Sequence, residues 1–194
     1  RVNGSERSAI DSQRVNKAAK PLVELQAGRI VTCKGDPTKN ESYLAWDSPV
    51  LSVADGTVVK VVSDATDIAP GALPPDVPLA EATGNRVIVD IGNGVYALFA
   101  HLRLGSPTVK VGDKVTKGQV IGRLGNSGNT SEPHLHFQLT RSAAPLVGDN
   151  LPYEFDSFDY VGVFKDTGEL DTSGAGPRTN QLPLANSITD YPKP

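Results

Sequence analysis

The chain has 194 residues and a formal net charge of −3, a length that accommodates one domain with a sizeable buried core. The weak negative charge and the lack of a basic stretch interleaved with aromatic residues argue against nucleic acid as a partner. No run approaches the roughly 18 apolar residues that span a bilayer, so no membrane span is predicted. The single cysteine, Cys33, excludes an internal disulfide and a four-cysteine metal site.

Short apolar runs alternate with turns between residues 49 and 139, which predicts β-strands and almost no helix. A Gly-Asn-Gly turn separates residues 85–91 from residues 95–101, so these two runs should form a hairpin. Regular short strands with glycine-rich turns indicate an all-β, antiparallel sandwich or open barrel. The expected strands are residues 50–54, 57–62, 85–91, 95–101, 109–111, 119–122 and 135–139.

Two stretches interrupt this pattern. Residues 63–83 contain four prolines, too many for a central strand, so we expect a long loop at one edge. Beyond residue 158 the sequence is rich in Gly, Thr, Ser and Pro, which predicts an extended tail with one or two edge strands. We therefore divide the chain into residues 1–48, an N-terminal segment or insertion, residues 49–158, the β core, and residues 159–194, a C-terminal extension.

Two of the three histidines, His134 and His136, stand one residue apart in a run that alternates polar and apolar residues. Alternate residues of a strand share a face, so both imidazoles should lie on one side, about 7 Å apart at the backbone. Such a pair suits a zinc site, or a metal beside a general base. Two surface histidines on an amphipathic strand are the alternative. The preceding loop of Gly, Asn, Ser and Pro and the scarcity of histidine favour a site. His101, at the end of another expected strand, would bring a third imidazole to the same cleft.

Four ordered segments resemble those of a known family. They are residues 49–59 (PVLSVADGTVV), 96–102 (YALFAHL), 111–122 (VGDKVTKGQVIG) and 125–137 (GNSGNTSEPHLHF). Together they resemble the M23 (lysostaphin/LytM-type) zinc metallopeptidases, which cut peptide cross-links in bacterial peptidoglycan. The resemblance implies the duplicated hybrid motif type of β-fold with long loops, Zn²⁺ as cofactor and a peptidoglycan or peptide substrate. It also implies an extracellular, periplasmic or cell-envelope location.

The resemblance also implies roles for the histidines. In the family, a His-x-x-x-Asp motif supplies two zinc ligands and the second histidine of H-x-H supplies the third. Carried over, His136 binds zinc, whereas His134 and His101 form the catalytic pair beside the metal-bound water. This arrangement agrees with the general plan of a catalytic zinc site, three protein ligands and a water molecule.

The first motif departs from the family, because no histidine precedes residue 101. Arg7 and Asp11 keep the spacing with arginine at the histidine position, and we prefer this pair, which makes Asp11 a metal ligand. Tyr43 and Asp47 also keep the spacing, but Asp47 lies too close to the following Pro-Val.

Arginine stays protonated and has no lone pair for a metal, so Arg7 should instead pair with Asp11. Two functions therefore stay open: a zinc metalloendopeptidase, and a catalytically inactive homologue that binds peptidoglycan or peptides. A biotinyl- or lipoyl-carrier domain shares the Val-Gly-Asp turns, but it needs a lysine beside methionine, and the chain has no methionine.

Overall fold

The computed structural model describes residues 10–12, 32–72, 77–144, 147, 149–165, 170–183 and 187–191, with the backbone alone for residues 10–12 and 164. The chain divides into two compact units, with described residues 10–12 and 32–151 in the first and residues from 152 onward in the second. Within these ranges the one helical element is a 3-10 turn, η2 (Asn40–Ser42), and all strand pairs are antiparallel. The predicted all-β antiparallel fold is confirmed.

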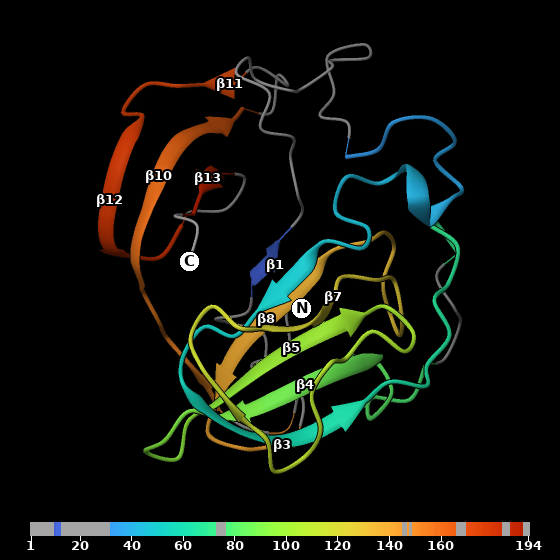
Figure 1. Cartoon of the computed structure of the whole chain (residues 1–194). Coiled ribbons are helices and arrows are strands. Elements are labelled where there is room, and N and C mark those ends of the chain that lie inside the picture. Colours follow the sequence, from blue (N-terminus) through green and yellow to red (C-terminus); the bar gives the residue numbers. More distant parts are fainter. Residues whose placement is uncertain are drawn as a thin grey trace. The chain divides into compact units, whose positions relative to one another are not determined.

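The first unit contains a seven-stranded sheet with the order β1-β8-β5-β4-β3-β6, and β9 also pairs with β8 (Figure 1). The strands β2 (Pro49–Leu51) and β7 (Val120–Arg123) form a separate two-stranded sheet. The strands of the large sheet are β1 (Ile10–Ser12), β3 (Gly56–Val62), β4 (Asn85–Asp90), β5 (Tyr96–Leu102), β6 (Lys114–Val115), β8 (Leu135–Thr140) and β9 (Asn150–Leu151).

The centre of this sheet is the predicted hairpin, β4 and β5. β5 is a nearly continuous apolar run and β4 has an apolar centre at residues 87–89, and Val87, Val89 and Ala97 are completely buried. Phe99 of β5 lies directly opposite Phe137 of β8, with ring centroids 5.3 Å apart. Burial of a large apolar side chain contributes about 1.5–3 kcal/mol. The core therefore holds β5, which carries His101, between β4 and β8, and β8 carries His136.

The expected strand at residues 109–111 is wrong. These residues enter a turn in which the Lys110 N–H donates to Asp113 Oδ2 (3.0 Å) and Gly112 adopts a φ of 94°. Extended backbone needs a negative φ, so the chain cannot pair until it has passed the turn. It then forms the short strand β6. The expected long loop at residues 63–83 is confirmed in its described parts, which form no strand or helix apart from an isolated bridge between Asp67 and Ser127.

The second unit has more regular structure than the expected tail. Its sheet contains β10 (Phe155–Phe164), β11 (Leu170–Asp171), β12 (Gly176–Gln181) and β13 (Ser187–Asp190), each of the last three paired with β10. Tyr191 packs against Phe155 and Phe158, with ring centroids 4.8 and 6.0 Å away. These aromatic contacts join residues that are distant in the sequence, and they support the strands. The strands themselves are short and interrupted by Gly and Pro, so their sequence shows little of the alternation that predicts a strand.

Candidate functional site

The structure brings the three histidines of the chain together. The ring centroid of His101 lies 4.7 Å from that of His134 and 5.9 Å from that of His136. His101 and His136 are buried and His134 is half-buried. The expected convergence of three imidazoles therefore exists in the fold, although the roles of the three side chains remain proposals.

His101 reaches the other two rings through an irregularity in β5. Asn85 pairs with Leu102 and Val87 pairs with Phe99, so β5 has one more residue than β4 over this stretch. His101 adopts a φ of 60°, in the left-handed region. Side chains alternate regularly between the two faces of a strand only where the backbone is extended, so this alternation is interrupted at His101. A non-glycine residue in that region costs on the order of 1–3 kcal/mol, and the surrounding structure must hold it. Such strain is concentrated at functional sites.

Backbone carbonyls determine the tautomers of two of the histidines. His101 Nδ1 lies 2.8 Å from the Ser127 carbonyl oxygen, and His134 Nδ1 lies 2.9 Å from that of Glu132. A carbonyl oxygen can only accept, so in both rings Nδ1 carries the proton and donates it. In the neutral form of each ring, Nε2 then carries the lone pair. Both side chains therefore present a proton-accepting nitrogen.

Two glycines allow the Ser127 carbonyl to reach His101. Gly84 and Gly128 both have positive φ values, 54° and 86°. A Cβ on Gly84 would lie 2.3 Å from the Ser127 oxygen, and a Cβ on Gly128 would lie 2.5 Å from the Ala82 oxygen. The segments around residues 84 and 128 therefore cross at a distance that no side chain permits, and this crossing holds the Ser127 carbonyl in place.

Asn126 anchors the loop that precedes the histidine strand. It is completely buried, and its side-chain amide donates to Asn40 Oδ1 and to the Ile68 carbonyl, both at 3.0 Å. Its Oδ1 accepts from Thr130 Oγ1, which also lies 3.1 Å from His134 Nδ1. None of these supporting residues was predicted from the sequence. Asn126 and Thr130 had one signal, their position inside a segment that resembles the family, and Asn40 and Ile68 had none.

His136 has the opposite tautomer. Its Nε2 lies 2.9 Å from Gln138 Oε1. With the amide in this orientation the facing oxygen can only accept, so a neutral His136 carries its proton on Nε2 and its lone pair on Nδ1. Gln138 is also buried, two residues further along β8. In the sequence, the one signal for Gln138 is its polar place in the alternating run that contains His134 and His136.

The two candidate aspartates lie in different environments. The backbone of Asp11 pairs directly with that of His136 across β1 and β8. Asp47 instead contacts Arg103 Nη1 at 2.9 Å and Arg123 Nη1 at 3.6 Å. The register thus favours Asp11 over Asp47 as the partner of the histidines. Arg7 lies outside the described residues.

Comparison with known proteins identifies the family. The sequence profile of Peptidase family M23 matches residues 43–147, more than half of the chain. The chain belongs to this family. Of the curated relatives, the peptidoglycan DD-endopeptidase ShyA of Vibrio cholerae is 40% identical over 63 residues, which are 32% of this chain and 14% of the relative. The peptidoglycan DD-endopeptidase ShyC of the same organism is 30% identical over 189 residues, 96% of this chain and 32% of the relative.

The chain spans about a third or less of the length of these M23 relatives. Among solved structures, the catalytic domain of lysostaphin from Staphylococcus simulans is 24% identical, with a TM-score of 0.40 over 57% of this chain and 77% of the other. Because the TM-score lies below 0.5, family membership rests on the sequence match and not on this superposition.

The donor set fits zinc in part. Imidazole nitrogen and carboxylate oxygen are both zinc ligands, and the chain places a histidine with its lone pair on Nδ1 directly opposite an aspartate in the sheet register. Among the described residues, however, no group of three His, Cys, Asp or Glu side chains could hold a metal ion. His136 and Asp11 are two candidate donors, and an arginine such as Arg7 has no lone pair with which to be a third.

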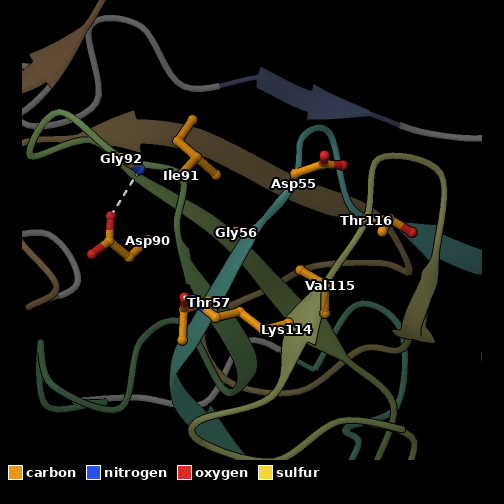
Figure 2. Close-up of a pocket in the computed structure, with 9 residues that line it drawn as sticks. All are labelled: Asp55, Gly56, Thr57, Asp90, Ile91, Gly92, Lys114, Val115 and Thr116. Carbon is orange, nitrogen blue, oxygen red and sulfur yellow. Dashed lines mark hydrogen bonds between the residues drawn. The ribbon is translucent and has the colours of Figure 1, made fainter.

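A surface depression of this M23 chain lies elsewhere. It lies between β3, β4 and β6 and is lined by Asp55, Thr57, Asp90 and Lys114 among others (Figure 2). Asp90 pairs with Tyr96, at the opposite end of the β4–β5 hairpin from His101. No helix in the described part of the chain has the length and apolar character needed to cross a membrane.

Proposed function

We propose that this chain is a zinc-dependent endopeptidase of the M23 family that hydrolyses peptide bonds, with peptidoglycan cross-link peptides as its substrate. The observation that carries the proposal is the cluster of three imidazoles, in which two rings carry the lone pair on Nε2 and the third carries it on Nδ1. One site therefore contains two proton acceptors and one nitrogen suited to a metal.

His136 and Asp11 would hold the zinc ion. The support is their pairing across β1 and β8 and the tautomer of His136. Zinc bound at such a site polarises a peptide carbonyl and lowers the pKa of a water molecule toward about 7.

His134 and His101 would move the protons of the hydrolysis. One ring would accept the proton released by the attacking water at Nε2 and would pass it to the leaving amine. The other, in its protonated form, would donate a hydrogen bond from Nε2 to the developing oxyanion. Their backbone partners keep Nδ1 protonated throughout, so each ring exchanges its proton at Nε2 alone. General acid–base groups of this kind contribute about 10²–10⁴-fold to a rate.

The proposed substrate and location follow from the relatives. Two are named peptidoglycan DD-endopeptidases, and a third, ALE-1 of Staphylococcus capitis, is named a glycyl-glycine endopeptidase. Two of these names give peptidoglycan, the cell-wall polymer, as the substrate, so this chain would act in the cell envelope, in the periplasm or outside the cell.

The test combines metal content with cleavage of cell-wall sacculi. We expect about one zinc ion per chain after loading at neutral pH, and release of peptide fragments from the sacculi. In a His136→Ala variant both should be lost. A protein that holds no zinc after loading would contradict the proposal.

A second candidate function is a catalytically inactive homologue that binds peptidoglycan peptides in the same place. The arginine at the position of the first ligand favours it, because a guanidinium repels a metal ion and pairs with carboxylates. If Arg7 stands at the ligand position, Arg7→His should raise zinc affinity. An unchanged affinity would show that Arg7 lies elsewhere, and binding of sacculi without cleavage would favour this second candidate.

A further inference from the structure

Gln138 is an unusual residue for a buried position in this sheet. It lies on β8 between two strands, has no exposed surface, and pairs across to Leu98 of β5. Leu98 belongs to an apolar cluster with Ile88 and Ala100. Burial of an amide in such surroundings costs free energy unless the amide forms hydrogen bonds. A polar interaction of its side chain, and not packing in the core, must therefore account for a glutamine at this position.

The contact of Gln138 provides that requirement. Its Oε1 lies 2.9 Å from His136 Nε2, and both residues lie on one face of β8, because they are two positions apart. The tautomers of His101 and His134 depend on backbone carbonyls, which every sequence possesses. The tautomer of His136 depends on a side chain, so a single substitution can change it.

We propose that Gln138 is a positioning residue that fixes His136 as the Nε2–H tautomer and orients its Nδ1 lone pair for a metal ion. The metal-binding part of this inference rests on the proposed function, whereas the tautomer part does not. Gln138 contacts neither substrate nor metal and acts through His136.

The other end of the amide makes the proposal testable. Among the described residues, Gln138 Nε2 has no hydrogen-bond partner. Rotation of the amide by 180° would direct this NH₂ group at His136, which would then accept at Nε2 and carry its proton on Nδ1. That tautomer offers a metal no lone pair at Nδ1. In either orientation one atom of the amide lacks a hydrogen-bond partner among the described residues. The two orientations therefore differ in the tautomer of His136 that each one selects.

The tautomer is read directly by long-range ¹H–¹⁵N NMR of the imidazoles in the metal-free protein, at a pH where the rings are neutral. We expect His136 as Nε2–H in the wild type. It should remain so in Gln138→Glu, because a carboxylate also only accepts. In Gln138→Leu, His136 should shift toward a mixture of tautomers. Thr140→Val is the matched control, because Thr140 is a buried polar residue on the same face of β8 whose hydroxyl bonds Ser142 instead.

Zinc affinity, measured by competition with a chelator, is the second readout. Partners that orient a metal-binding histidine typically change affinity by about 10–100-fold. We expect a loss of that size in Gln138→Leu, recovery in Gln138→Glu and no change in Thr140→Val.

A wild-type His136 with its proton on Nδ1 would overturn the proposal without any variant, as would a Gln138→Leu protein with an unchanged tautomer. A wild type that binds no zinc would contradict the proposed function, and the NMR measurement would still decide the role of Gln138.

Discussion

The two ends of the β4–β5 hairpin differ in how their polar groups are held. At one end, His101 and His136 are buried, and each ring has an acceptor oxygen within 3 Å. At the other end, the carboxylates line an open depression and bond to turn N–H groups: Asp90 accepts from Gly92 (2.9 Å) and Asp55 from Lys117 (2.7 Å).

The depression is therefore a hollow whose polar groups hold local structure and are not oriented toward a ligand. Its carboxylates stabilise turns, and Lys114 Nζ donates to Thr57 Oγ1 at 2.6 Å. The histidine end shows the reverse: its polar atoms are oriented before any substrate arrives. Preorganised groups in a site shielded from water are worth more than exposed ones, so hydrogen-bonded orientation is a better guide to the site than the hollow of the surface.

The largest expected effect is on catalysis at the histidine end. His134→Gln and His101→Gln should each lower kcat for sacculus peptides by about 10²–10⁴-fold, because each removes a proton acceptor. Zinc content should remain that of the wild type, since neither residue is assigned as a ligand. Steady-state kinetics with metal analysis of each variant provide the measurement. A wild-type kcat in both variants would show that the histidine end of the β4–β5 hairpin is no more important for catalysis than the end with the depression.

The glycines of the two ends provide a matched comparison of stability. Gly84→Ala should lower the free energy of unfolding by about 3 kcal/mol or more, because the new Cβ meets the Ser127 oxygen and φ is positive. Gly92 also has a positive φ, 91°, but its Cβ would meet no described atom within 4 Å. Gly92→Ala should therefore cost only about 1–2 kcal/mol. Denaturant unfolding measures both, and equal losses would show that the close crossing at Gly84 is unimportant.

A smaller effect tests the strained backbone of His101. His101→Gly and His101→Ala both remove the ring and its bond to Ser127, but only glycine adopts a φ near 60° without cost. The glycine variant should be more stable by about 1 kcal/mol. If alanine proves as stable as glycine in thermal unfolding, the left-handed conformation stores no strain.

The smallest effect should come from the depression. Asp90→Asn alters a half-buried group and Lys114→Gln an exposed one, and surface changes of this kind usually stay within about 0.5 kcal/mol in stability. Cleavage of sacculi should change by less than about twofold. A large loss of cleavage in either variant would place part of the substrate site at this end.

Much of the fold could be predicted because its signals are local. Apolar runs between turns located β4 and β5. The polar–apolar alternation after Pro133 located β8 and predicted that His134 and His136 share a face. The missed features depend on distant residues. The turn at Gly112 displaced an expected strand, and the sheet around β10 is supported by aromatic contacts such as that between Phe155 and Tyr191.

The sequence by itself determined the family segments, the strand pattern and which three imidazoles the chain possesses. The tertiary structure alone decided which acceptor oxygen faces each ring. The acceptor of His101 is 26 residues away along the chain, and its ring lies beside the other two where β5 contains an extra residue. Periodicity describes which face a residue occupies, whereas a tautomer depends on a single oxygen atom whose position the whole fold determines.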